Sequence, residues 1–284
     1  HYNDARLAPP ESGKGEEFQV TAGVSALREG PGDDARMVTQ ALHGETLTLY
    51  QEHGFYGLVR KADDGYVGWV DLETIAAPAL PPTHRVSALR TYVFSEPDLK
   101  SAPHYLCSLN SRVVAEDSQD KFIRCARAGW IFAGHLVELG VYEDDPAAVA
   151  ERFEGCPYLW GGRESLGLDC TGLTQTAFEA CGVMLPRDSD MQAEWSGVDI
   201  ENWTAPGTLQ RGDLVFWNGH VGLMLDGTRI IHANAHHMAC AIEPLTEAIE
   251  RIGSLYGQPT RAKRIDLDIE QTAAWRSAIS DLSD

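Results

Sequence analysis

The chain has 284 residues, of which 43% are hydrophobic and 23% are charged, and its formal net charge is −19. This length exceeds what one small hydrophobic core needs, so two or three domains are expected. The excess of carboxylates argues against nucleic acid and anionic membrane surfaces as partners, because both would repel the protein. No segment approaches the roughly 20 consecutive apolar residues that a membrane-spanning helix requires.

Residues 1–17 form a polar N-terminal extension that contains Pro9, Pro10 and Gly13. None of it resembles the apolar core of a signal peptide. This predicts a cytoplasmic protein, and a periplasmic or secreted one would follow if a signal had been removed from the sequence.

Residues 18–77 contain short runs in which apolar and polar side chains alternate, at 19–27, 46–50, 56–60 and 65–70. Turn-forming residues separate these runs, namely G-P-G at 30–32, H-G at 43–44 and D-D-G at 63–65. Short strands at such spacing predict a small all-β barrel. The proline-rich run at 76–82 predicts a stiff connector and a domain boundary.

Residues 83–140 repeat this scheme more weakly. The pentapeptide V-S-A-L-R at 86–90 is identical to that at 24–28, and G-W-I at 129–131 echoes G-W-V at 68–70. Internal similarity of this kind is typical of duplicated folds, although one pentapeptide is modest support. The sequence therefore predicts a second, diverged copy of the same barrel.

From residue 144 the pattern becomes helical. Asp145 and Pro146 are residue types that favour a helix N-cap and first helical position, and they predict a helix over 145–153. A second helix is predicted over 170–181, where apolar residues recur at four-residue spacing and Gly182 ends the run.

Strands follow these helices. We predict three strands, at 213–217, 220–225 and 229–233. A short helix is predicted over 245–252, an edge strand over 261–267 and a helical tail beyond 267. A helix packed on an antiparallel sheet is an α+β arrangement. The third domain, residues 144–284, is therefore predicted to be α+β.

Cys170 follows a glycine-rich loop and stands at the first turn of the helix predicted over 170–181. A thiol there faces unpaired backbone N–H groups and the positive end of the helix dipole. Both favour the thiolate, which is the nucleophilic form. The other five cysteines lack this setting and are expected to pack mostly as small apolar residues, with a disulfide framework as the weaker alternative. The sequence predicts a cysteine nucleophile.

His220 and His232 lie in two of the predicted strands. We assign His220 as general base and acid, and His232 as the group that fixes the tautomer of its imidazole. Both rings must then share one face of the hairpin. A two-residue turn at 226–227 would place them on opposite faces, whereas a three-residue turn over 225–227 would pair 220 directly with 232. The longer turn, or a compensating bulge, is predicted.

Two further features leave alternatives open. Tyr158 could donate a hydrogen bond to an oxyanion, or simply pack beside the glycines that follow it. A competing metal site would use residues with ligand-like spacing: His232, His236, His237 and Cys240. Alternate residues of a strand point apart, so neither a metal nor a cofactor is predicted.

The motifs of the third domain extend over 144–267. They are P-Y-L-W-G-G at 157–162, D-C-T-G-L at 169–173, L-P-R-D-S at 185–189 with Gln192, R-G-D-L-V-F at 211–216, H-V-G at 220–222 and I-H-A at 231–233. Together they resemble the NlpC/p60 family of cell-wall cysteine peptidases, whose common D-C-S-G is D-C-T-G here. The resemblance implies a papain-like fold with Cys170, His220 and His232 in the catalytic positions.

The two barrels resemble the bacterial SH3-type domains of one branch of this family, the gamma-D-glutamyl-L-diamino-acid endopeptidases, also called dipeptidyl-peptidase VI. The resemblance implies hydrolysis of the γ-D-Glu–diamino acid bond in free murein peptides that begin with L-Ala. It also implies that the first SH3-type domain helps to form the site, where carboxylates can pair with the substrate ammonium group. Substrate contacts are then expected from Asp169, Asp188, Ser189, Tyr66, Glu29, Trp160 and Thr171.

Other functions stay open at this point. The barrels could anchor a hydrolase of intact sacculi to the cell wall, or the chain could be a non-catalytic peptide-binding module. An acyltransferase or amidase on the same fold is a further alternative. The preferred diamino acid, L-Lys or meso-diaminopimelate, and the oligomeric state do not follow from the sequence.

Overall fold

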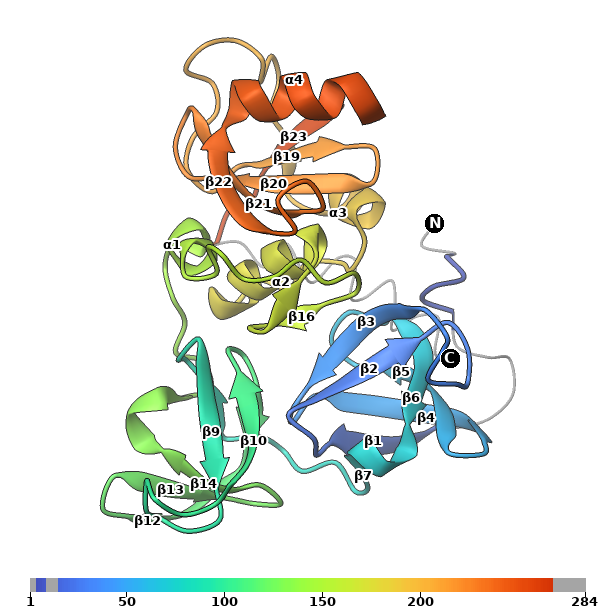
Figure 1. Ribbon diagram of the computed structural model, residues 1–284, viewed down its shortest axis with the longest axis vertical. Helices are drawn as coiled ribbons and strands as arrows, with labels where there is room; N and C mark the ends of the chain where they lie inside the picture. Colours follow the sequence, from blue (N-terminus) through green and yellow to red (C-terminus); the bar gives the residue numbers. More distant parts are fainter. Residues whose placement is uncertain (1–3, 9–14, 268–284) are drawn as a thin grey trace. The chain divides into compact units, whose positions relative to one another are not determined.

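The computed structural model describes residues 4–8 and 15–267 (Figure 1). One compact unit reaches to Val141, and a second begins at Tyr142. The predicted helical tail lies outside the described residues. Within the described part of the chain, no helix is long and apolar enough to cross a membrane.

The first barrel is a single seven-stranded sheet with the order β3-β2-β6-β5-β4-β1-β7. Alternating side chains point inward and form one apolar core that includes Leu27, Leu47, Val59 and Val70. A short 3-10 helix, Leu72–Thr74, precedes the last strand. The strands are β1 (Glu16–Val20), β2 (Val24–Arg28), β3 (Met37–Leu42), β4 (Thr46–His53), β5 (Tyr56–Lys61), β6 (Val67–Asp71) and β7 (Ile75–Ala76).

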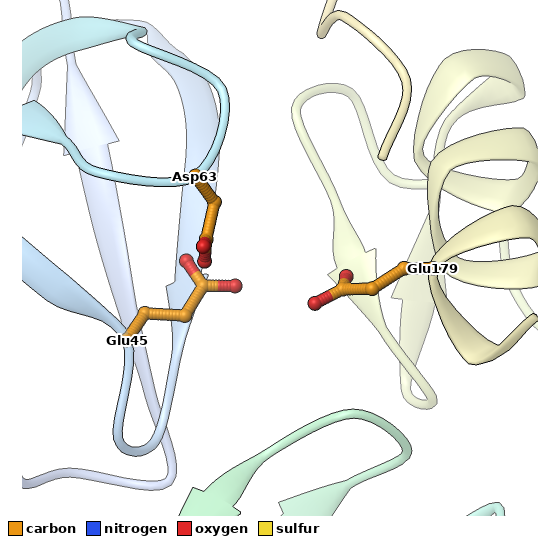
Figure 2. A group of neighbouring side chains, drawn as sticks. All are labelled: Glu45, Asp63 and Glu179. Carbon is orange, nitrogen blue, oxygen red and sulfur yellow. The ribbon is translucent and has the colours of Figure 1, made fainter. Parts of the chain in front are cut away.

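The first barrel contains a buried group of charges around Lys61. Lys61 Nζ lies 3.2 Å from a carboxylate oxygen of Glu45 and 3.2 Å from one of Asp64. Figure 2 shows the carboxylates of Glu45 and Asp63 pointing toward each other. Asp63 accepts a hydrogen bond of 3.0 Å from Arg112 of the second barrel. Charges removed from water need such partners, so this cluster ties the two barrels into one unit.

The second barrel repeats the topology of the first. Its strands run in the order β10-β9-β14-β13-β12, with a small sheet β11-β8-β15 beside them. The long strand β4 of the first barrel corresponds here to two pieces, β11 and β12, which pair with β8 and β13. The strands are β8 (His84–Val86), β9 (Arg90–Phe94), β10 (Pro103–Ser108), β11 (Arg112–Val113), β12 (Ala115–Gln119), β13 (Phe122–Cys125), β14 (Gly129–Phe132) and β15 (Leu136–Glu138).

The two sequence echoes differ in what they report. The tryptophans of the G-W echo are equivalent, because Trp69 of β6 pairs with Arg28 of β2 and Trp130 of β14 pairs with Phe94 of β9. The identical pentapeptides are not equivalent: residues 24–28 form β2, whereas residues 86–90 run from the end of β8 to the start of β9. The evidence for a duplication is therefore the shared strand topology and the G-W echo, and the pentapeptide does not contribute to it.

The second unit is built around a six-stranded sheet with the order β18-β23-β19-β20-β21-β22. In Figure 1 its strands lie between helices α4 and α2. The predicted edge strand is wrong in place, because β23 lies inside the sheet between β18 and β19. The elements are α1 (Pro146–Glu151), β16 (Arg163–Glu164), β17 (Gly167–Leu168), α2 (Cys170–Ala180), α3 (Ser189–Trp195), β18 (Val198–Asp199), β19 (Leu214–Trp217), β20 (His220–Met224), β21 (Arg229–Asn234), β22 (Ala239–Pro244), α4 (Leu245–Tyr256) and β23 (Arg261–Arg264).

Helices α1 and α2 begin where the sequence signals lie. Asp145 caps α1 by accepting hydrogen bonds of 2.9 and 3.2 Å from the N–H groups of Ala147 and Ala148. Helix α2 packs on β20 and β21 and carries Glu179, whose side chain is drawn in Figure 2. The Glu179 carboxylate accepts a hydrogen bond of 3.0 Å from the buried Arg163. Strand β22 and helix α3 have no counterpart among the predicted elements.

Helix α4 covers the sheet face that presents Met224 of β20 and Ile230 of β21. Its buried residues Leu245, Ala248 and Ile252 share one hydrophobic core with them. Side chains alternate along a strand, so His232, two residues after Ile230, lies on the face that α4 covers. The packing of α4 therefore bears directly on the histidine site.

Candidate active site

Asp169 sets the geometry of the loop before α2. As N-cap, its Oδ1 accepts a hydrogen bond of 2.7 Å from the Gly172 N–H, and its Oδ2 accepts one of 2.8 Å from the Gly161 N–H. Arg187 donates to both carboxylate oxygens, at 3.0 and 2.6 Å. The Thr171 hydroxyl donates to Oδ1 at 3.1 Å and accepts from Arg187. This network locks the glycine loop onto the first turn of α2, where Cys170 stands.

Both Asp169 carboxylate oxygens have hydrogen-bond donors, and the network is buried. Arg187 is 1% exposed and Asp169 is 6% exposed. Burial acts to lower the pKa of Arg187, but the carboxylate of Asp169 outweighs it and raises that pKa, so the guanidinium keeps its charge. A Cβ atom on Gly172 would overlap the carbonyl oxygen of Gly162, which explains why glycine stands at position 172.

Cys170 is the first residue of α2 and is 9% exposed. Burial, and then the nearby charge of Asp169, raise the pKa of its thiol to about 12, although backbone N–H groups of Val221 and Thr171 act in the opposite direction. The helix terminus was predicted to favour the thiolate, but desolvation is the larger effect and favours the thiol. The sulfur therefore needs a base to ionise.

His220 and His232 lie on one face of the sheet, as predicted. The Nε2 atom of His220 is 2.8 Å from the Nδ1 atom of His232. Burial is the main cause that lowers the pKa of His220 to about 3, with the nearby His232 and Arg251 adding to it. The imidazole is thus neutral at neutral pH and can accept a proton. Transfer from Cys170 would create two opposite charges that stabilise each other in a poorly solvated site.

The hairpin register differs from the predicted one. Leu223 pairs with Ile231 and Met224 with Ile230, so a turn of three residues over 226–228 connects the strands. Continuing this register places Gly222, not His220, opposite His232, and a Cβ atom on Gly222 would lie 3.3 Å from that of His232. The direct pairing of 220 with 232 is therefore wrong, and the two rings meet diagonally.

The side chain of Asp226 explains the displaced turn. Its Oδ1 accepts hydrogen bonds of 2.8 Å from the N–H groups of both Thr228 and Arg229. An aspartate that binds the backbone two and three residues ahead moves the turn forward by one residue. The turn length was predicted correctly, and only its position was not.

Glu243 and Arg251 extend the histidine pair and were not predicted. The Nε2 atom of His232 is 2.6 Å from Oε1 of Glu243, and Arg251 of α4 donates to the same oxygen. Burial acts to raise the pKa of Glu243, but the hydrogen bond from His232 and the charge of Arg251 outweigh it and lower that pKa. The missed signal is the short apolar run A-C-A-I at 239–242, which immediately precedes Glu243 and has the length of a buried strand.

Cys170 and His220 line one pocket of about 520 Å³. Tyr158 and Trp160 from the glycine loop and Arg251 from α4 line it too, and Trp160 is 59% exposed. Burial and the charge of Cys170 raise the pKa of Tyr158 above its usual range, so its hydroxyl stays protonated and can donate a hydrogen bond. The pocket thus brings together a sulfur, a base and a hydroxyl donor.

The other predicted contacts lie elsewhere. Thr171 is buried in the Asp169 network, and Asp188 and Ser189 are half-buried at the start of α3. Tyr66 and Glu29 belong to the first barrel: Tyr66 is 5% exposed, and Glu29 forms an exposed ion pair of 3.6 Å with Arg36. Their roles toward a substrate stay predictions.

The competing metal site is not assembled in the described part of the chain. His232 is engaged by His220 and Glu243, and His237 Nδ1 is 3.0 Å from the amide oxygen of Asn234. All six cysteines are buried and none of them forms a disulfide, so the disulfide framework is absent.

Family comparisons agree with this architecture. Residues 155–251 match the model of the NlpC/P60 family, and residues 27–75 match that of the bacterial dipeptidyl-peptidase Sh3 domain. A crystal structure of an NlpC/P60 family protein from Bacillus cereus ATCC 10987 superposes with a TM-score of 0.74 at 20% identity, covering 88% of this chain and 99% of that one. An NlpC/P60 endopeptidase from Photobacterium damselae subsp. piscicida gives a TM-score of 0.62 at 15% identity, covering 90% and 72%. These likenesses show the fold.

Curated relatives include two whose match covers most of the chain and one whose match is partial. The gamma-D-glutamyl-L-lysine dipeptidyl-peptidase of Bacillus subtilis (strain 168) is 26% identical over 235 residues, which is 74% of this chain and 77% of that protein. The protein of the same name from Bacillus cereus is 25% identical over 242 residues, covering 74% and 71%. Dipeptidyl-peptidase 6 of Lysinibacillus sphaericus is 34% identical over 111 residues, and the match spans only 40% of its length. The chain thus carries an NlpC/P60 domain behind a bacterial dipeptidyl-peptidase Sh3 domain, and it is a hydrolase of the cysteine peptidase class to which NlpC/P60 domains belong.

Proposed function

We propose that the protein hydrolyses the γ-D-Glu–diamino acid bond of free murein peptides that begin with L-Ala. The observation that carries the proposal is the pocket shared by Cys170 and His220, in which His220 is hydrogen-bonded to His232. The names of the two Bacillus relatives support the choice of bond, since both are gamma-D-glutamyl-L-lysine dipeptidyl-peptidases.

Each residue has a defined step in this reaction. His220 takes the proton of the Cys170 thiol, and the thiolate attacks the carbonyl carbon of the γ-amide. The tetrahedral oxyanion accepts a hydrogen bond from the Tyr158 hydroxyl, and the His220 imidazolium gives its proton to the departing amine. Water, deprotonated by His220, then attacks the thioester, which releases the dipeptide acid and regenerates the thiol. In acylation the proton of the thiol leaves with the amine, and in deacylation a proton of the water returns to the thiolate.

The charge of the pocket suits such a substrate. Arg251, His220 and His236 line it, and no carboxylate does so among the residues that the structure describes. In a chain of net charge −19 this is a local exception. Murein peptides carry free carboxylates beside the scissile bond, so a pocket without acidic residues avoids repelling them.

Incubation with L-Ala-γ-D-Glu-L-Lys and with its meso-diaminopimelate equivalent tests the proposal by mass spectrometry. We expect wild-type protein to release L-Ala-D-Glu, and Cys170→Ala to lower the rate at least about a thousandfold. Acetylating the L-Ala amino group should abolish cleavage, because a desolvated ammonium partner would be left unpaired. Cleavage of intact sacculi, or equal cleavage of blocked peptide, would support the wall-hydrolase alternative instead.

A further inference from the structure

The hydrogen bonds of the histidine pair continue into a chain that ends on helix α4. From the pocket inward, His220 Nε2 is 2.8 Å from His232 Nδ1, and His232 Nε2 is 2.6 Å from Glu243 Oε1. Arg251 closes the chain by donating to that same oxygen. The His232 side chain is fully buried, and those of Glu243 and Arg251 are 11% and 22% exposed. Four side chains from β20, β21, β22 and α4 thus form one line.

The donor and acceptor roles along this line of side chains follow from Arg251, at its far end. A guanidinium can only donate, so Glu243 must accept from Arg251, and an ionised carboxylate can only accept from His232 as well. With one proton on His232, that proton then sits on Nε2, and Nδ1 is an acceptor. His220 must donate to it from Nε2, which leaves Nδ1 of His220 as its unprotonated nitrogen.

We propose that Glu243 is a positioning residue: held by Arg251, its carboxylate fixes the tautomers of His232 and His220 so that His220 presents a lone pair for the Cys170 proton. The proposal rests on Cys170 being the nucleophile of the proposed function. It goes beyond that function by assigning a fourth residue to the site and by giving α4 a part in it.

The fold supplies the placement of Glu243. His232 pairs with Ala241 across the β21–β22 ladder, and Glu243 lies two residues further on the same face. Pro244 then ends the strand, and α4 returns over this face with Arg251 in its second turn. The carboxylate therefore reaches the ring from the strand, and the cation that neutralises it arrives from the helix.

The opposite charges of Glu243 and Arg251 should have opposite effects on the basicity of His220, which a purely structural ion pair would not produce. Among the described residues, His220 is influenced by His232, Arg251 and Glu243, and Glu243 by His232, Arg251 and His237. The Glu243 carboxylate favours a positive charge on His220, and the Arg251 guanidinium disfavours it. Glu243→Gln should therefore weaken the base, whereas Arg251→Met should strengthen it. A role in packing alone predicts that both variants lose function alike.

The closing experiment measures alkylation of Cys170 by iodoacetamide against pH, with the modified peptide quantified by mass spectrometry. At pH 7 we expect about a tenfold slower reaction for Glu243→Gln and an equal or faster one for Arg251→Met. Glu243→Leu, which removes the acceptor, should be slower than Glu243→Gln. Glu247→Gln, at an exposed position in the first turn of α4, is the matched control and should equal wild type.

Nitrogen NMR of the histidine rings reports the tautomers directly. In wild type we expect the proton of His232 on Nε2 and that of His220 on Nε2, and in Glu243→Leu a mixture at both rings. With murein tripeptide, Glu243→Gln should lower kcat about 10- to 100-fold and leave KM within twofold. Unchanged tautomers and alkylation profiles in the Glu243 variants would overturn the proposal. Failure of wild type to cleave the tripeptide would refute the proposed function alone, because alkylation and NMR need no substrate.

Discussion

Two polar networks of the peptidase domain meet at Cys170, and they are built in opposite ways. In the first, the carboxylate of Asp169 accepts from Gly161, Gly172, Thr171 and Arg187, so that fixed donors occupy both oxygens. In the second, His220 is hydrogen-bonded to His232, His232 is hydrogen-bonded to Glu243, and Glu243 accepts from Arg251 at the far end. One network branches from a single acceptor, and the other is a line.

The difference matters for chemistry. Every donor around Asp169 is a backbone N–H, a hydroxyl or a guanidinium that keeps its proton at neutral pH, so the network can hold a shape but cannot move charge. An imidazole can exchange donor and acceptor roles between its nitrogens, so a line of them can transmit the state of one end to the other. The branched network fixes the loop and the helix start at which Cys170 stands, and the linear one is the network that we propose directs the proton of its thiol.

The largest effect should come from breaking the branched network at its cation. Arg187→Met leaves the Asp169 carboxylate buried without its charged partner, and we expect the free energy of unfolding of this domain to fall by about 3–5 kcal/mol. Urea denaturation, monitored by alkylation of the buried Cys156, Cys181 and Cys240, measures it. Arg229→Met is the matched control, because the Arg229–Asp226 pair is exposed and should cost under about 1 kcal/mol. Equal losses in both variants would mean that the Asp169 network is not a structural anchor.

A second, smaller effect should distinguish the linear network by its dependence on pH. Burial lowers the pKa of His220 from 6.5 to about 3, so below pH 6.5 the unfolded chain binds a proton that the folded chain does not. Stability therefore falls as pH drops from 6.5 toward 3, by up to about 1.4 kcal/mol per pH unit from this one group. Replacing His220 by Asn removes that contribution, so the variant should gain up to about 2 kcal/mol on wild type at pH 5 relative to pH 7.5.

Native-state hydrogen exchange of α2 amides at the two pH values measures this difference after correction for intrinsic exchange rates. Because the other titrating groups are common to both proteins, their contributions cancel. Parallel stability curves for wild type and variant from pH 7.5 to 5 would show that His220 is not kept neutral by burial.

Local signals in the sequence predicted most of the peptidase fold. The N-cap and proline at 145–146 begin α1, and the residues of the D-C-T-G motif begin α2, because capping depends on neighbours within four residues. The pattern of apolar residues in the strands does not reveal the hydrogen bonds that the Asp226 side chain makes to the backbone of the turn. The turn was therefore predicted one residue too early, and His220 was predicted to pair directly with His232. The diagonal contact between the two histidine rings can be predicted only when the register of the hairpin is known.

Long-range partners were harder to predict for a physical reason. Arg187 meets Asp169 across 18 residues, and Glu243 meets His232 only because β22 joins the sheet beside β21. No periodicity encodes such a meeting. The pKa of Cys170 shows the same limit: its helix terminus is a local feature that favours the thiolate, whereas the burial that raises its pKa to about 12 comes from tertiary packing.

The smallest effect should come from trimming the branched network without removing its charge. Thr171→Val deletes one hydroxyl that donates to Asp169 at 3.1 Å, while Arg187 and both backbone N–H groups stay in place. The hydroxyl also accepts from Arg187, so two hydrogen bonds are lost, but Asp169 and Arg187 keep their other partners. We therefore expect a loss of only about 1 kcal/mol in the free energy of unfolding. We also expect KM for murein tripeptide to stay within twofold, because the hydroxyl is already engaged inside the protein. A rise in KM of tenfold or more with unchanged stability would instead assign Thr171 to the substrate, and the branched network would then have a part in recognition as well as in shape.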